Sequence, residues 1–232
     1  MNKNIYIKKI NTVGDCAVWL VDGALIRKEI NENFVKCSLN NKSDFVPQNE
    51  FWIDEDLDPK EYRYFIDRFI YEQGLLDSGK NYTAADKKAD EFEKKERQNS
   101  PEVRRIAQSN QNKKDLLEKI KKRIIKKFSG EIKIWLVDGN LVRSFFLLDY
   151  CEGGHDLVYP FIPKNEIWIE ETISPKERKF IILHELHERY LMSQGKSYKN
   201  AHIGATEVED HYRENLKEDL GARIREEMKK NE

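Results

Sequence analysis

Two spacings of hydrophobic and polar residues occur along this chain, one typical of strands and the other of helices. Between Glu166 and Glu170 apolar and polar side chains alternate singly, which predicts a half-buried β-strand. From Ser174 to Gly195 apolar residues recur at helical spacing. Ser174 is a typical helix N-cap, the proline after it suits the first helical position, and Gly195 is a typical C-terminal stop. A second helix is predicted to begin near Ser197.

Further stretches before this helix pair have the composition of strands. Residues 132–137 and 141–148 flank the pair Asp138 and Gly139, which predicts a β-hairpin. Residues 156–162 predict another strand. A small sheet of a hairpin plus strands, followed by two helices, is an α+β arrangement.

The same plan occurs twice, because the sequence matches itself at a displacement of 116 positions, the separation of Trp19 from Trp135. The matches need no gap, so we interpret them as an internal repeat. The matched pairs include Trp19 and Trp135, Arg27 and Arg143, Trp52 and Trp168, Pro59 and Pro175, Glu72 and Glu188, Gly79 and Gly195, and Glu93 and Glu209. We therefore expect two tandem α+β copies, at residues 1–97 and 131–232, joined by a basic helical linker at residues 98–130.

Composition narrows the class of protein. Charged residues make up 36% of the chain, above the usual ~25%, while the net charge is only −1, so the overall charge does not indicate a nucleic-acid or membrane partner. The three cysteines are widely spaced, which favours a reducing compartment over a disulfide framework. No run approaches the ~18 apolar residues of a membrane span, and the N-terminus lacks a signal-peptide core. We expect a cytoplasmic protein with no membrane contact, and its oligomeric state does not follow from the sequence.

The segment 94–127 is the one strongly basic region. It carries thirteen basic side chains against four acidic ones, a local excess of nine positive charges. Leu116, Leu117, Ile120 and Ile124 form an apolar stripe at helical spacing. One interpretation is a contact with nucleic acid or an acidic partner. The other, which we favour because no aromatic residues are interleaved for base stacking, is a solvated helix docked on a domain.

Candidate chemistry is concentrated in the predicted helix that follows Ser174. His184, Glu185, His187 and Glu188 fall within five positions of an otherwise apolar stretch. His184 and Glu188 are four apart and so share one helix face. Glu185 follows the first histidine directly, where zinc hydrolases with a His-Glu-x-x-His motif carry their general base. The alternative is a half-exposed amphipathic helix whose charges are solvated.

Comparison of the two copies favours a site. All five histidines of the protein lie in the second copy, whereas the first copy has none. At the matching positions His184 is replaced by Arg68 and His202 by Asp86, an opposite-charge pair, as expected if the two positions face each other. Drift at exposed positions is the competing explanation. The pairing leads us to predict one metal site in the second copy and a salt bridge in its place in the first.

At this point the sequence resembles the core of small zincin-type metallopeptidase domains. The resemblance covers about residues 165–209 and rests on the strand Glu166–Glu170, a Ser-Pro-x-Glu-Arg helix start and the run Phe-Ile-Ile-Leu-His-Glu-Leu. It implies that His184 is the first zinc ligand and that Glu185 deprotonates the metal-bound water. Glu188 stands where that family has its second histidine. A carboxylate there weakens the nucleophile and shifts preference from zinc toward another divalent transition metal such as manganese or iron.

The third ligand implied by the resemblance comes from the second helix. His202 and Glu209 are seven residues apart, ~10 Å along a helix, so one ion does not take both. We favour His202, because its replacement in the first copy accompanies that of His184. Glu209 is expected to orient a histidine, with a structural salt bridge as the alternative. His187 is expected to face away as a surface histidine, and His155 to be a turn residue, with metal ligand or substrate contact as its alternatives.

Two functional hypotheses follow. In the first, the protein is a metal-dependent hydrolase, peptidase-like and acting on a protein or peptide substrate, with its active site in the second copy and a metal-free pseudo-domain as the first. In the second, it is a non-enzymatic interaction or scaffold protein with structural histidines, which contacts nucleic acid or an acidic partner through segment 94–127.

Overall fold

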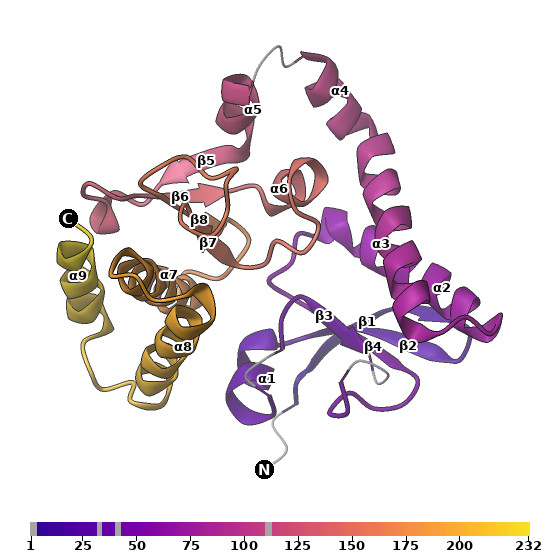
Figure 1. Cartoon of the computed structure of the whole chain (residues 1–232). Coiled ribbons are helices and arrows are strands. Elements are labelled where there is room, and N and C mark those ends of the chain that lie inside the picture. The colour runs from indigo at the N-terminus through magenta and orange to yellow at the C-terminus, as the bar shows by residue number, and fades with distance from the viewer. Residues whose placement is uncertain (1–3, 32–33, 40–42, 110–112) are drawn as a thin grey trace. The chain divides into compact units, whose positions relative to one another are not determined.

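A computed structural model describes residues 4–31, 34–39, 43–109 and 113–232. The chain divides into two compact units, Met1–Asn110 and Gln111–Glu232. Each unit combines one four-stranded sheet with helices, which confirms the α+β class (Figure 1).

The first unit has the sheet order β1-β2-β4-β3, in which β2 and β4 are parallel and the two outer strands antiparallel to their neighbours. Its elements are β1 (Tyr6–Val13), β2 (Cys16–Val21), α1 (Gly23–Glu29), β3 (Cys37–Leu39), β4 (Glu50–Asp54), η1 (Pro59–Glu61), α2 (Tyr62–Asp77), α3 (Tyr82–Asn99) and α4 (Pro101–Ser109).

The second unit has the corresponding order β5-β6-β8-β7, with the same strand directions. Its elements are α5 (Lys113–Ile120), β5 (Lys121–Ile124), η2 (Lys126–Phe128), β6 (Lys133–Val137), α6 (Gly139–Phe145), β7 (Gly153–His155), β8 (Glu166–Glu170), α7 (Glu177–Ser193), α8 (Tyr198–Glu214) and α9 (Leu220–Lys230). Trp135 pairs with Trp168 across the parallel strands, as Trp19 pairs with Trp52 in the first unit, so the two sheets share their topology and register.

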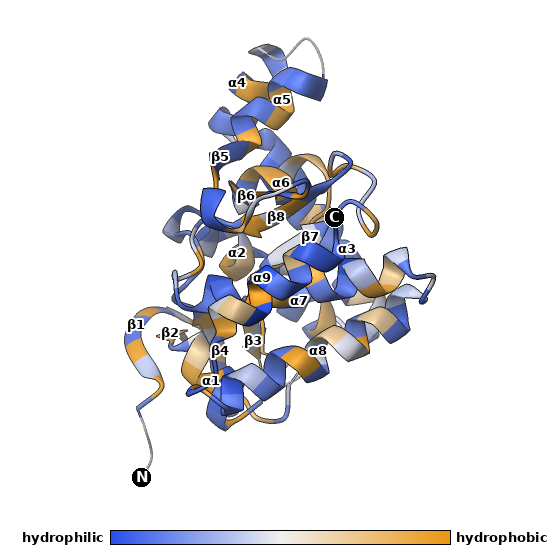
Figure 2. Cartoon of the chain, turned by 90° about the vertical axis from the view of Figure 1, so that its left-hand side faces the viewer, coloured by the Kyte–Doolittle hydropathy of each residue, from blue (hydrophilic) through white to orange (hydrophobic). Residues whose placement is uncertain are grey.

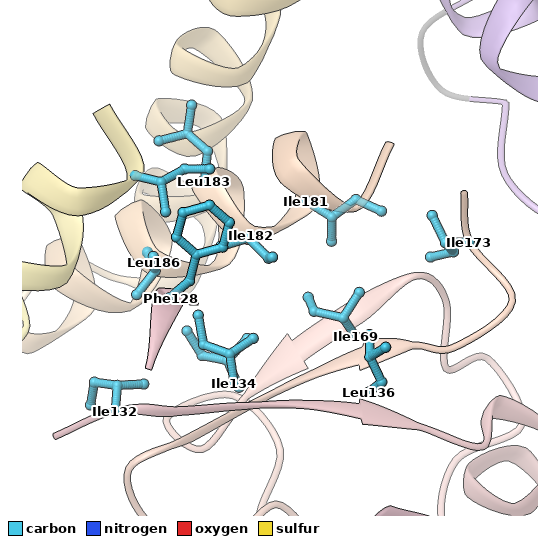
Figure 3. Close-up of a cluster of buried hydrophobic side chains, with 12 residues drawn as sticks. Phe128, Ile132, Ile134, Leu136, Ile169, Ile173, Ile181, Ile182, Leu183 and Leu186 are labelled. Carbon is cyan, nitrogen blue, oxygen red and sulfur yellow. The ribbon is translucent and has the colours of Figure 1, made fainter. Parts of the chain in front are cut away.

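The core of the second unit lies between α7 and its sheet. Figure 3 shows side chains of α7 facing those of β6 and β8, among them Ile181, Ile134 and Ile169. Each such apolar side chain contributes roughly 1.5–3 kcal/mol when it is fully buried. Along α8 and α9 hydrophilic and hydrophobic bands alternate (Figure 2). Ile224 of α9 is buried in the same core. This packing holds α7 rigidly by its apolar face and leaves the opposite side for other contacts.

The predicted strand Glu166–Glu170 is confirmed as β8, and the predicted helices are confirmed as α7 and α8. Gly195 follows α7 with φ +88, the left-handed conformation of a helix C-terminal stop. The turn between α7 and α8 is therefore short, and it sets the two helices side by side.

The predicted hairpin around Asp138 and Gly139 is wrong. Residues 139–145 form helix α6, and the Asp138 side chain caps it by accepting a hydrogen bond from the Leu141 amide at 3.1 Å. A side chain at Gly139 would overlap the Glu170 carboxylate, which is held by Arg143 at 2.9 Å. Glycine is therefore required here for close packing and not for a left-handed turn.

The prediction of a strand at residues 156–162 is also wrong. The strand that pairs with β8 is β7, which ends immediately before residue 156. The chain turns after β7, where the amides of Val158 and Tyr159 both donate to the His155 carbonyl. Gly154 allows this turn to fold back, since a Cβ there would overlap the Tyr159 ring.

The predicted basic helical linker is helical only in part. Residues 98–109 belong to the first unit and residues 113–130 to the second, where Lys121–Ile124 is strand β5 and not the end of a helix. Residues 110–112 lie outside the described residues. Arg97 is fully buried between Glu61 and Glu93, at 2.6 and 2.8 Å, and so is not part of a solvent-facing basic surface. Among the described residues, no helix combines the length and apolar character needed to cross a membrane.

Candidate metal centre

Three elements of the second unit bring the candidate ligands together. Helix α7 carries His184 and Glu188 one turn apart, on the side away from the core. Helix α8, packed against it, carries His202 and Glu209. Strand β7 contributes His155. Residues far apart in the sequence thus meet because the short turn at Gly195 sets α8 along α7 and because β7 lies against α7.

His184, Glu188 and His202 converge as predicted. The His184 Nε2 atom lies 3.6 Å from Glu188 Oε2 and 3.1 Å from His202 Nδ1. Ligand atoms bonded at ~2.0–2.2 Å to a tetrahedral ion lie roughly 3.3–3.6 Å apart. The third separation, from His202 Nδ1 to Glu188 Oε2, is 2.7 Å. This last separation is shorter than ligand spacing and is that of a hydrogen bond, and the His202 side chain is 50% exposed.

The Nδ1 atom of His184, on the opposite side of the ring from the other candidate ligands, is hydrogen-bonded to Glu209. The Nδ1 atom donates to Glu209 Oε2 at 2.9 Å, and Arg213 bridges Glu209 to Glu177 at 2.8 and 2.7 Å. Burial would raise the pKa of Glu209, but the hydrogen bond from His184 and the charge of Arg213 lower it to about 2. Glu209 is therefore ionised at neutral pH, which directs the Nε2 atom of His184 toward Glu188 and His202.

Charge around His184 is also unusual. Burial alone would lower the pKa of His184, but the Glu188 and Glu209 carboxylates outweigh it and raise the pKa to about 10. Burial would raise the pKa of Glu188, but hydrogen bonds with His155, His184 and His202 hold it well below its usual range. The cluster therefore places ionised carboxylates around a position that favours a cation.

Glu185 occupies a different environment from the other carboxylates. It is 8% exposed, and among the described residues its carboxylate forms no hydrogen bond or ion pair. Burial raises the pKa of Glu185 to about 8, with the negative charges of Glu188 and Glu209 adding to the rise and the charge of His184 opposing it. An unpartnered carboxylate with a pKa near neutrality has the properties of a general base.

The sequence suggested that His155 is a turn residue. In the structure it is a fully buried residue at the end of β7. Its Nε2 atom lies 3.0 Å from Glu188 Oε1, on the other oxygen from the one that faces His202. Ligand-type atoms of His155, Glu185 and Glu188 lie within 4.8 Å of one another and form a second group next to the first.

His187 points away from this cluster, as predicted, but it is not a surface histidine. Its Nδ1 atom lies 3.1 Å from Glu227 Oε2 of α9, and its side chain is 13% exposed. Glu227 is fully buried and also contacts Arg223 at 2.7 Å. His187 therefore belongs to the packing of α9 on α7.

Tyr159, which lies near the candidate centre, was not identified from the sequence. Its ring stacks on Phe161 and fits against Gly154. Burial raises the pKa of Tyr159, and the nearby carboxylates of Glu185 and Glu188 raise it further. The available signal was the pair of glycines before His155, which marks a close approach of side chains to the backbone.

The first unit has an arginine where the second has His184. Arg68 contacts Asp86 and Glu72 at 2.6 Å each, Asp90 at 2.7 Å and Glu93 at 3.6 Å. The predicted pair of Arg68 with Asp86 is confirmed. The Arg68 guanidinium, at the sequence position that matches His184, is thus surrounded by carboxylates.

Comparison with protein-family models, with curated proteins and with solved structures finds no match for this chain.

Proposed function

We propose that the second unit is a metal-dependent hydrolase centre of the zincin type, in which His184, Glu188 and His202 bind one divalent transition metal ion. The observation that carries this proposal is the convergence of two imidazole nitrogens and a carboxylate oxygen from two packed helices, with these atoms all within 4.8 Å of one another. The donor set fits such an ion, because two nitrogens and one oxygen leave a fourth position for water or substrate. Zinc suits it, and the carboxylate also admits manganese or iron.

The residues around the ligands supply the remaining functions. A bound ion of this kind polarises a carbonyl and lowers the pKa of a bound water. Glu185 accepts the proton of the attacking water and passes it to the leaving group. Its pKa of about 8 falls when a cation is bound nearby, so the carboxylate is then ionised at neutral pH. Glu209, held by Arg213, fixes the orientation of His184.

We further propose that the chain is a tandem duplication whose first copy is a metal-free pseudo-domain. The shared strand order supports this, as do equivalent buried pairs, since Arg27 contacts Asp54 as Arg143 contacts Glu170. The substrate class that we propose is protein or peptide, as the resemblance to zincin-type metallopeptidase domains implies.

Metal analysis of the purified protein tests the proposal, with a control taken from the chain itself. The double variant His184→Arg/His202→Asp reproduces the pair of Arg68 with Asp86 and should fold without metal. The wild type should hold one equivalent of metal and the double variant none, while Glu185→Gln should keep the metal and lose hydrolysis of an unstructured protein such as casein. A wild type without bound metal after incubation with zinc, manganese and ferrous iron would refute the centre, and a bound metal without any hydrolysis would reduce it to a structural site.

A further inference from the structure

The contact between His155 and Glu188 divides the two oxygens of the Glu188 carboxylate. Oε1 lies 3.0 Å from His155 Nε2, and Oε2 lies 2.7 Å from His202 Nδ1 and 3.6 Å from His184 Nε2. The His155 side chain is fully buried and the Glu188 side chain is 4% exposed, so water does not compete for Oε1. One oxygen is thus taken by β7, and the other faces the candidate ligands.

The backbone decides which nitrogen of His155 carries the hydrogen. The Leu157 amide donates to His155 Nδ1 at 3.2 Å, so Nδ1 must be an unprotonated acceptor. The hydrogen of the neutral ring is then on Nε2, which donates it to Glu188 Oε1. A metal bound at Nε2 would move the hydrogen to Nδ1, where it would face the Leu157 N–H. His155 therefore suits a hydrogen-bond donor and does not suit a metal ligand.

The architecture of the strand does not need this imidazole. The matching residue of the first copy is Leu39, at the end of β3, and it pairs with Phe51 as His155 pairs with Ile167. The two edge strands have the same length and register with either residue. Histidine thus occurs at this strand position in the copy that also has His184 and His202, and the pairing of the strand does not require it.

We propose that His155 is a positioning residue that holds Glu188 so that Oε2 alone faces the metal, and that the centre consequently holds one ion and not two. Any effect of His155 on catalysis rests on the proposed function above, whereas its effect on metal binding is measured independently of activity. An outer partner of a metal ligand typically contributes 10–100-fold to metal affinity. Without the donor, both oxygens of Glu188 become available and the carboxylate can bind through both.

Titration of the full chain with Co²⁺ tests this, because the visible spectrum of Co²⁺ reports its coordination number. His155→Leu reproduces the first copy, and His155→Gln retains an amide that can donate to Glu188. The wild type should bind one Co²⁺ with the intense absorption of four-coordination. His155→Leu should bind 10–100-fold more weakly, with the fainter absorption of a higher coordination number. His155→Gln should lie closer to the wild type in both affinity and spectrum.

Each other outcome has a distinct meaning. A wild type that binds no Co²⁺ contradicts the proposed function itself. A wild type that binds two ions makes His155, Glu185 and Glu188 a second site and overturns this inference alone. His155→Leu with unchanged affinity and spectrum also overturns it. So does loss of binding in both His155 variants to the level of His184→Ala, because His155 would then be a ligand.

Discussion

Metal binding at this centre should release about two protons at pH 7, one from His184 and one from Glu185. The pKa of His184 is raised to about 10 and that of Glu185 to about 8 before an ion binds. At pH 7 His184 is then fully protonated and Glu185 roughly 90% protonated. An ion replaces the first proton directly. Because the ion displaces the charged proton of His184, the net gain is one positive charge, which at ~5 Å from Glu185 and an effective dielectric near 20 favours the ionised form of Glu185 by roughly 3 kcal/mol and expels the second proton.

The affinity should therefore depend steeply on pH. Below pH 7 the logarithm of the association constant should rise by about two for each pH unit, and from pH 8 to 9.5 by about one, because only His184 is still protonated there. For Glu185→Gln the logarithm of the association constant should rise by about one for each pH unit over the whole range, because this variant lacks the proton of Glu185 and keeps that of His184.

Calorimetric titration in buffers of different ionisation enthalpy measures the proton count directly. The double variant His184→Arg/His202→Asp gives the baseline for adventitious binding elsewhere on the chain. Release of fewer than about half a proton at pH 7, or equal release by the wild type and Glu185→Gln, would refute the charge distribution described here.

Three further predictions concern stability of the metal-free protein. Arg213→Ala should lower the free energy of unfolding by about 1.5–3 kcal/mol in urea, because it removes the guanidinium that contacts both the Glu177 and the Glu209 carboxylates; a loss under 0.5 kcal/mol, on the order of an ordinary surface substitution, would contradict this. Gly154→Ala should lower it by roughly 1–3 kcal/mol, since the added Cβ meets the Tyr159 ring, and no change would show that the turn yields freely. His184, with its raised pKa, stabilises the fold fully below its unfolded value near 6.5 and loses that contribution as the pH rises through about 10, so the Tm should fall between pH 7 and 10. A His184→Arg/His202→Asp variant whose Tm falls equally over that range would exclude His184 as the cause.

The elements that depend on local spacing could be predicted from the sequence, whereas those that depend on distant contacts could not. Helix α7 and strand β8 have clear periodicity and end signals, so both were predicted correctly. Asp138 and Gly139 suit either a hairpin turn or a helix N-terminus. What favours the helix is the Glu170 carboxylate, which lies where a side chain at Gly139 would be, and this contact links helix α6 to strand β8.

The same distinction separates the residues of the candidate centre. His184 and Glu188 share a helix face, and the exchange for Arg68 and Asp86 indicated that position 202 lies opposite. The contact of His155 with Glu188 arises only because β7 pairs with β8 and α7 lies across them, and no spacing in the sequence expresses that register. A helix pair alone would present both oxygens of Glu188 to an ion. The sheet, by taking one of them, gives the strand a direct effect on the coordination of a metal bound between the helices.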